Sequence, residues 1–370
     1  MITSYLMGSA GEIALAAVLL VVGIVMIVKG GDWFVDAASW IAEISGLSPL
    51  LVGATVVSVA TTLPELIVSV IATARGSNEI AVGNAVGSVV ANLGLIMAIS
   101  LFFMPGKVNR KQYAFKSVML LIAALNLFLV GFFGEVKNDN HVMGIITGVL
   151  VLELFFLFVG ENVLSAIKSM KNPVANGLSP ESDGTNVKIE SVGLAREATE
   201  APVAEEEKPE PVKKDKKTII INVLKFIGGA VGIIGGADLL VRYGQKLALA
   251  AGVSEGIIAI TLVAIGTSLP ELVTTITAIV KKKSAISVGN IIGANILDLT
   301  MILPICAMVS GGTLIFPKQS IMLDLPFCLG LSAIAVVPML ITKKFQRWQG
   351  VLLLLAYGGY IALRVIYTQP

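Results

Sequence analysis

The stretch TTLPELIVS, Thr61 to Ser69, lies inside a long apolar run that extends from Leu50 to Ala74. It places a proline beside a glutamate where the apolar pattern would otherwise predict a membrane helix. Proline removes a helix hydrogen bond, and a carboxylate is costly to hold in lipid. The combination recurs as TSLPELVTT, Thr267 to Thr275. Because it occurs twice, we interpret it as a functional feature and not as an accident of composition.

The composition predicts an all-α polytopic membrane protein. The chain has 370 residues, of which 55% are hydrophobic and 14% charged, and its mean hydropathy is +0.88. A soluble domain would be about 45–50% apolar and about 25% charged. A net charge of +2 provides no strong attraction for nucleic acid. Cys306 and Cys328 lie in apolar runs without metal-ligand spacing, and we expect them to be buried and no cofactor to be bound.

Ten apolar runs are long enough to cross the roughly 30 Å hydrocarbon core of a bilayer. They cover approximately 12–37, 49–74, 79–103, 114–134, 142–164, 218–243, 254–280, 285–309, 320–341 and 346–367. The segment 168–217 between the fifth and sixth runs is polar and mixed in charge, and it predicts a flexible linker. Lysine and arginine concentrate in the short loops after the third, seventh and ninth runs, which places those loops in the cytoplasm. Both termini are then outside and the linker is cytoplasmic.

The chain contains an internal repeat. Residues in 53–97 align without a gap with residues in 259–303, and Glu65 and Glu271 occupy equivalent positions 206 residues apart. The halves 1–167 and 218–370 hold five spans each, an odd number, so they must cross the membrane in opposite senses. Inverted repeats with irregular helices at matching positions are typical of transporters whose site lies near the bilayer midplane.

Oxygen atoms gather around each glutamate. Pro64 and Pro270 are each expected to open a helix and free backbone carbonyl oxygens. Two hydroxyl residues precede each glutamate by four and three positions, which places them on the same helix face. They are Thr61 and Thr62 before Glu65, and Thr267 and Ser268 before Glu271. An oxygen-only ligand set favours a hard cation such as calcium, and sodium is similar in size.

The following helix of each repeat adds a polar face. Asn84, Ser88 and Asn92 are spaced by four residues, and they therefore share one face. Their equivalents in the second repeat are Asn290, Ala294 and Asp298. Three acids that meet at one site cannot all be ionised without a cation, so Asp298 is a candidate proton carrier or neutral ligand.

These motifs resemble the two alpha repeats of the calcium/cation antiporter superfamily. The similar stretches are TTLPEL with GNAVGSVVANLGL, and GTSLPEL with GNIIGANILDL. Within the superfamily, the chain looks most like prokaryotic sodium/calcium exchangers. The resemblance implies a ten-helix fold with spans two, three, seven and eight around central cation sites. It also implies that spans one and six slide across this core to give alternating access.

Carried over position by position, the resemblance implies the following ion ligands: Glu65, Glu271, Asp298, Asn92, Ser88, Thr61, Thr62, Thr267 and Ser268, with backbone oxygens from Ser58 and Ala264. Three positions depart from the family pattern. Ala60 replaces a usual glycine, and Thr62 replaces a serine but keeps its hydroxyl. Ala294 replaces a serine, so one sodium-ligating hydroxyl is missing and the sodium stoichiometry is open.

The sequence therefore predicts a sodium/calcium antiporter of a prokaryotic plasma (inner) membrane that functions as a monomer. Proton/calcium exchange is one alternative. Potassium co-transport is another, because DLTMILP, Asp298 to Pro304, is similar to the potassium-dependent branch. An intramembrane enzyme with two catalytic acids is disfavoured by the hydroxyl-rich, repeat-symmetric surroundings. The inverted repeat favours alternating access over a passive channel.

Overall fold

The computed structural model describes residues 10–137, 140–171, 215–251 and 266–368. Nine described helical spans are long and apolar enough to cross a membrane, and a shorter apolar helix, Leu269–Val280, accompanies them. The predicted fold class, a helical polytopic membrane protein, is confirmed. The start of the seventh predicted span, most of the linker 168–217 and Ala264 lie outside the described residues.

The spans are built from the following elements, several of them from two or three joined segments. The first half contains α2 (Ala10–Ser45), α3 (Pro49–Val52), η1 (Gly53–Val57), α4 (Ser58–Ala74), α5 (Asn78–Ala91), η2 (Asn92–Met97), α6 (Ala98–Phe103), α7 (Arg110–Phe133) and α8 (Ile145–Lys171). The second half contains α9 (Lys216–Ala250), α12 (Leu269–Val280), α13 (Ser284–Leu297), η5 (Asp298–Ile302), α14 (Leu303–Val309), η6 (Ser320–Asp324), α15 (Leu325–Thr342) and α16 (Arg347–Thr368).

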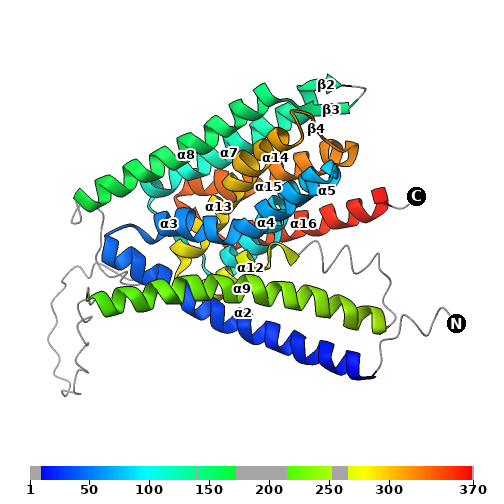
Figure 1. The fold of residues 1–370 in the computed structure, drawn as a ribbon. Helices are drawn as coiled ribbons and strands as arrows, with labels where there is room; N and C mark the ends of the chain where they lie inside the picture. The colour runs from blue at the N-terminus through cyan, green and yellow to red at the C-terminus, as the bar shows by residue number, and fades with distance from the viewer. Residues whose placement is uncertain (1–9, 138–139, 172–214, 252–265, 369–370) are drawn as a thin grey trace, which may run out of the picture.

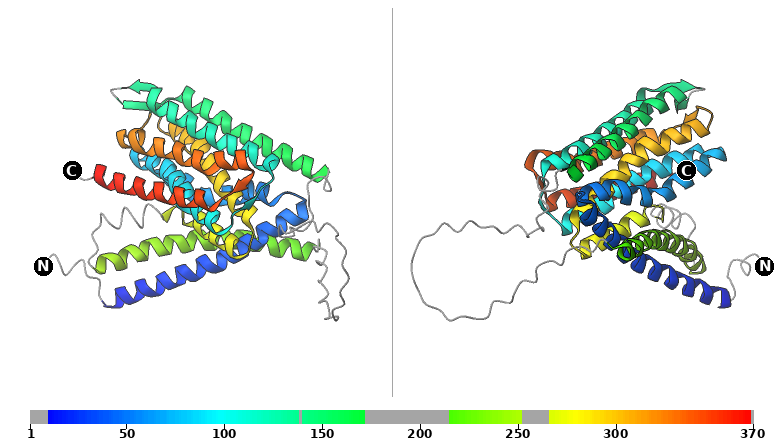
Figure 2. Two further views of the ribbon diagram at one scale, coloured as in Figure 1. Left: turned by 180° about the vertical axis from the view of Figure 1, so that it is seen from behind. Right: turned by 60° about the vertical axis from the view of Figure 1, so that its left-hand side comes forward.

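Two long helices form a layer of their own. α2 and α9 lie side by side below the remaining helices in Figure 1, and the views in Figure 2 show the same separation. In the apolar windows of α2 and α9 17% of the residues are buried, compared with 83% for the span Ser284–Val309. The pair therefore exposes most of its surface, whereas α13 lies at the centre of the bundle. α12 contacts both the pair and the bundle.

Glycines allow α2 and α9 to approach closely. A Cβ added at Gly30 would lie 2.8 Å from the carbonyl oxygen of Gly229, and one added at Gly23 would lie 2.9 Å from that of Gly236. Such small residues are typical of membrane helices whose backbones are in contact. Gly23 and Gly229 are equivalent under the 206-residue repeat, as are Gly30 and Gly236, so the two close contacts are related by the repeat.

The central helices carry π-helical turns at the polar positions. η2 begins at Asn92 and η5 begins at Asp298, which are equivalent positions of the two repeats. A third π-turn, η1, comes directly before α4. A π-turn inserts an extra residue into the helix and leaves backbone groups without their regular partners, and it is frequent at functional sites.

The structure differs from the sequence expectation at Pro64. This proline lies inside a continuous α4, so it does not divide the helix as predicted; the irregular backbone lies about two to three turns earlier, in η1. At Pro270 the expectation holds better, because α12 begins at Leu269 after a turn at Thr267 and Ser268.

Short strands, which the sequence did not predict, connect some helix ends. β1 (Gly106–Lys107) pairs with β5 (Lys344–Phe345), and β3 (Asn140–Met143) pairs with both β2 (Glu135–Lys137) and β4 (Leu314–Ile315), all antiparallel. The fifth span therefore begins at Ile145, after β3, and not near residue 142. At the start of α9, hydrogen bonds from Thr218 to the Asp215 side chain cap the helix and lower the pKa of Asp215.

Candidate cation site

Three acids are buried where α4, α12 and α13 meet. Glu65, Glu271 and Asp298 are each 1% exposed, and the three carboxyl groups lie close enough to interact electrostatically. Glu65 is in α4, Glu271 is in the first turn of α12, and Asp298 follows α13 as the first residue of η5. The ion pairs formed among the described residues include none of these three acids. Their charges are therefore not balanced by a described lysine or arginine.

Hydrogen bonds cross between the two repeats at equivalent positions. Thr61 Oγ1 lies 3.2 Å from Asn290 Oδ1, and Thr267 Oγ1 lies 3.2 Å from Asn84 Oδ1. In each case the hydroxyl of one repeat donates to the asparagine of the other. Thr61 Oγ1 also lies 3.3 Å from the Ser58 carbonyl oxygen. The hydroxyls that precede the glutamates thus connect α4 to α13 and the turn before α12 to α5.

A third connection between the repeats involves Asn92. Its Nδ2 donates to Asn295 Oδ1 at 3.1 Å, and both residues are buried. Asn84 Nδ2 donates to the Glu65 carbonyl oxygen at 3.2 Å and to Ser69 Oγ at 2.9 Å. The polar side chains of α5 and α13 therefore face α4, α12 and one another.

Acceptor oxygens in this region lack hydrogen-bond donors. The unpartnered buried oxygens are Glu65 Oε1 and Oε2, Glu271 Oε2, Asp298 Oδ1, Asn92 Oδ1, Thr62 Oγ1 and Ser268 Oγ. A buried carboxylate without donors or counter-charge is costly, and such groups are normally paired or coordinate a cation. Two amide nitrogens of the cluster, Asn290 Nδ2 and Asn295 Nδ2, are also buried without a partner. The unpartnered oxygens are the groups that fit a hard cation of the calcium or sodium type.

Asp324 shows how this chain satisfies a carboxylate with a structural role. It is fully buried, yet one oxygen accepts from Tyr360 at 3.0 Å and Arg364 at 2.8 Å, and the other from Ser320 at 2.9 Å. Both of its oxygens are paired, and Arg364 balances its charge. Glu65 has neither kind of partner among the described residues.

Carboxylates alone would not complete a site. Within the described ranges, no three Asp, Glu, His or Cys side chains cluster closely enough to hold a metal ion by themselves. A cation bound among these acids would therefore also need hydroxyl, amide or carbonyl oxygens. Thr62, which is buried one turn before Glu65, and Ser268, which is buried directly before α12, offer such oxygens.

The other residues expected at the site fall in several places. Ser58 is fully buried at the start of α4, and Ser88 is buried on α5 one turn before Asn92. Thr267 is partly exposed and bonds Asn84. Ala294, fully buried, stands at the position equivalent to Ser88 and brings no hydroxyl. Ala264 is not among the described residues.

Sequence reasoning missed Asn295. It follows Ala294 in a helix whose residues from Ile286 to Leu297 are all buried, and it does not lie on the four-residue spacing used to choose candidates. The available signal was an amide in a segment otherwise made of apolar and small residues. Asn84 and Asn290 were recognised as part of a polar face, but their bonds across the repeats were not predicted.

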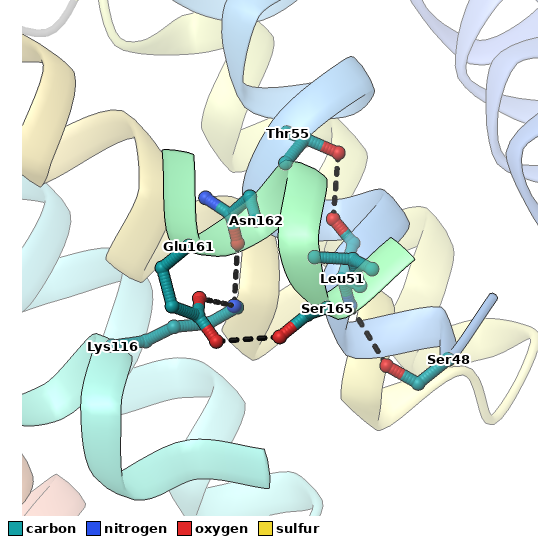
Figure 3. Close-up of polar contacts among 7 residues, drawn as sticks. All are labelled: Ser48, Leu51, Thr55, Lys116, Glu161, Asn162 and Ser165. Carbon is teal, nitrogen blue, oxygen red and sulfur yellow. Dashed lines mark hydrogen bonds and ion pairs between the residues drawn. The ribbon is translucent and has the colours of Figure 1, made fainter. Parts of the chain in front are cut away.

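A separate polar cluster lies on α7 and α8 (Figure 3). Lys116 Nζ donates to Asn162 Oδ1 at 2.6 Å and to Glu161 Oε2 at 3.4 Å, and Ser165 donates to Glu161 at 2.5 Å. A cavity of about 250 Å³ opens between η1 and α8, beside Asn162. Its lining is mostly apolar and includes Leu51, Ala54, Phe158 and Leu297, whereas the three central acids do not line it. We therefore assign the candidate cation site to the acids and not to this cavity.

Comparison with known proteins agrees with this geometry. The family model described as "Sodium/calcium exchanger protein" matches residues 15–162 and 221–366. The sodium/calcium exchanger MaX1 of Methanosarcina acetivorans is 27% identical, over 93% of this chain and 97% of the relative. An uncharacterized membrane protein of Methanocaldococcus jannaschii is 29% identical, over 90% of this chain and 93% of the relative.

A solved structure of the sodium-calcium exchanger NCX_Mj, soaked with zero Na⁺ and Ca²⁺, superimposes with a TM-score of 0.70. It is 26% identical to this chain, and the match covers 95% of this chain and 99% of the other. The family model, the relatives and the structural match span both halves of the molecule. The chain belongs to the sodium/calcium exchanger family, a family of membrane transporters.

Proposed function

We propose that this chain is a secondary active antiporter that exchanges sodium for calcium across a prokaryotic plasma membrane. The observation that carries the proposal is the group of buried acceptor oxygens on Glu65, Glu271 and Asp298, which have no donor or counter-charge to balance them. A divalent cation would supply that balance. Membership of the sodium/calcium exchanger family supports calcium and sodium as the transported ions.

Glu65 and Glu271 hold calcium between the two repeats. The remaining proposed ligands are Asp298, Asn92, Ser88, Thr61, Thr62, Thr267 and Ser268, with carbonyl oxygens of Ser58 and Ala264. Sodium competes for overlapping positions, so calcium and sodium bind alternately and not together. Asp298 serves as a neutral ligand when the two glutamates already balance the charge of calcium.

The transport cycle follows from the arrangement of the halves. Residues 1–167 and 218–370 cross the membrane in opposite senses, the linker 168–217 is cytoplasmic, and both termini are outside. The α2–α9 pair moves as a unit across the bundle and opens the cation site to one side at a time. Its separation from the other helices and its contacts through α12 support this assignment. Proton/calcium exchange is the alternative that the transport measurements below distinguish.

The test is calcium uptake into sodium-loaded vesicles that contain the purified chain. Replacing Glu65→Gln or Glu271→Gln removes one of the two charges that hold calcium, and we expect uptake to fall to the level of protein-free vesicles. Glu153→Gln is the matched control, because Glu153 is an exposed glutamate within α8, outside the site. Retained uptake in either site variant would refute the assignment of the calcium ligands.

A further inference from the structure

Three of the proposed ligands give their protons to asparagine oxygens that lie outside the ligand set. Thr61 donates to Asn290, Thr267 donates to Asn84, and Asn92 donates to Asn295, at 3.2, 3.2 and 3.1 Å between the heavy atoms. Each bond joins one repeat to the other. The acceptor in every case is a side-chain amide oxygen, and Asn290 and Asn295 are both fully buried.

The direction of these hydrogen bonds determines which atoms of the ligand side chains would face a bound cation. A hydroxyl has one proton and two lone pairs, and a side-chain amide has an oxygen end and an NH₂ end. If the proton-bearing side faced a cation, the contact would be repulsive. When the proton is donated outward, the oxygen lone pairs are left to face the ion.

Asn92 shows this effect most clearly. Its NH₂ group is engaged by Asn295, and its Oδ1 is buried without a partner. A rotation of the amide by half a turn would place NH₂ where the oxygen now lies and would break the bond to Asn295. With Asn295 in its observed orientation, in which its own Nδ2 is buried without a partner, Asn92 offers an oxygen.

Asn84 is itself held in one orientation. Its Nδ2 donates to the carbonyl oxygen of Glu65 and to Ser69 Oγ, so its Oδ1 is the atom left to accept from Thr267. On the other side, the single proton of Thr61 has two acceptors within reach: Asn290 Oδ1 at 3.2 Å and the Ser58 carbonyl oxygen at 3.3 Å.

We propose that Asn84, Asn290 and Asn295 are positioning residues that take protons from Thr267, Thr61 and Asn92 and so turn the oxygens of these ligands toward the cation. The inference rests on the proposed function, because it concerns the same site. Partners that orient metal ligands through hydrogen bonds typically contribute 10- to 100-fold to metal affinity. None of the three asparagines needs to touch the ion for this effect.

The first test is a double-mutant cycle on Asn92 and Asn295, with calcium affinity of the purified full-length chain measured by calorimetry. Asn295→Leu keeps the approximate volume and removes the acceptor, and we expect calcium binding to weaken about tenfold. In an Asn92→Asp background both ends of the side chain are oxygens, so no orientation is needed. There the same substitution should weaken binding less than about twofold. A residue that matters only for packing would cause the same loss in both backgrounds.

The second cycle examines Asn290 independently. We expect Asn290→Leu to weaken calcium binding about tenfold in the native chain, and to have little further effect in a Thr61→Ala background, where no hydroxyl remains to be oriented. Asn126→Leu, on α7, is the matched control, since Asn126 is a partly buried asparagine outside the ligand set and its Oδ1 makes no hydrogen bond. If a leucine variant does not fold, serine at the same position replaces it in the test. Serine also removes the side-chain amide oxygen that accepts the hydrogen bond, and it does not place an apolar side chain among the polar ones.

The outcomes separate this inference from the proposed function. If the native chain neither binds calcium nor takes it up, the proposed function fails. If the native chain binds and transports calcium but the losses persist unchanged in both backgrounds, or are absent in the native chain, only the positioning role is overturned. The positioning role is supported if the loss of calcium affinity disappears in the Asn92→Asp or the Thr61→Ala background.

Discussion

At the scale of single residues, the proposed site depends on the balance of charge between Glu65, Glu271 and Asp298. Three carboxylates buried together cannot all carry a charge, because each would be desolvated and would repel the others. Two negative charges match one calcium ion, so the third acid is expected to be neutral in the calcium-bound state. The repeat places this third acid where the first half has the neutral amide Asn92.

The first prediction follows from this neutral role. Asp298→Asn replaces a neutral carboxyl by an amide of the same shape, so calcium affinity should fall by less than about tenfold, which is about 1.4 kcal/mol. Glu65→Gln removes a required charge and should abolish binding. Calorimetric titration of both variants with calcium measures the difference, and equal loss in the two would show that Asp298 is charged when calcium is bound.

The second prediction concerns Ala294, which stands where Ser88 stands in the other repeat. Ala294→Ser adds a hydroxyl oxygen at a fully buried position, and we expect the sodium concentration for half-maximal calcium release from vesicles to fall several-fold. Ser88→Ala removes the equivalent oxygen and should raise that concentration. If Ala294→Ser leaves it unchanged while Ser88→Ala raises it, the two positions do not play equivalent roles.

At the scale of helices, much of the fold could be predicted from the sequence, because hydropathy determines where a chain can cross lipid. The ten apolar runs and the repeat identified the spans, and the proline–glutamate pairs identified the helices that carry buried acids. Helix irregularities were harder to predict. The π-turns at Asn92 and Asp298 depend on packing between helices, and no local pattern in the sequence marks them.

The same limit applies to the site. Spacing by three or four residues placed Thr61 and Thr62 beside Glu65, since that relation is fixed within one helix. The partner of Asn92 could not be found in this way, because Asn295 comes from the other repeat and its contact depends on the approach of α13 to η2. At Pro64, proline propensity predicted a break, but a single lost hydrogen bond is compatible with a continuous α4 inside a packed bundle.

The third prediction tests the contact between α2 and α9. A Cβ at Gly30 would lie 2.8 Å from the carbonyl oxygen of Gly229, so Gly30→Ala forces the helices apart and should lower stability by about 1–3 kcal/mol. Gly160→Ala in α8 is the control, because its Cβ would meet nothing within 4 Å. Thermal unfolding in detergent compares the two. A midpoint for Gly30→Ala at or above that of Gly160→Ala would show that the close contact is absent in solution.

At the scale of the whole molecule, the two layers suit a carrier in which one part moves against the other. The α2–α9 pair is connected to the bundle at one end by Lys281, whose Nζ lies 2.7 Å from Asp36 and 3.4 Å from Asp32 of α2. These ion pairs are partly exposed, and such pairs typically contribute about 0–1 kcal/mol. In the proposed transport cycle, these pairs would therefore form and separate without a large barrier.

For an assumed calcium gradient of about 10⁴-fold and an assumed sodium gradient of about tenfold, the energy of exchange limits the number of sodium ions. Moving calcium against a 10⁴-fold gradient costs about 5.5 kcal/mol, and two sodium ions moving down a tenfold gradient return only about 2.8 kcal/mol. Three sodium ions return about 4.2 kcal/mol, and the single net charge that they carry adds about 2.3 kcal/mol per 100 mV. We therefore expect three sodium ions per calcium and a transport rate that depends on membrane voltage.

The most direct test of exchange is calcium uptake by sodium-loaded vesicles in which the sodium and proton gradients are collapsed separately. With the native chain, we predict uphill calcium uptake that stops when a sodium ionophore removes the sodium gradient and continues when a proton ionophore is added. Uptake that persists without a sodium gradient and stops with the proton ionophore would contradict sodium/calcium exchange.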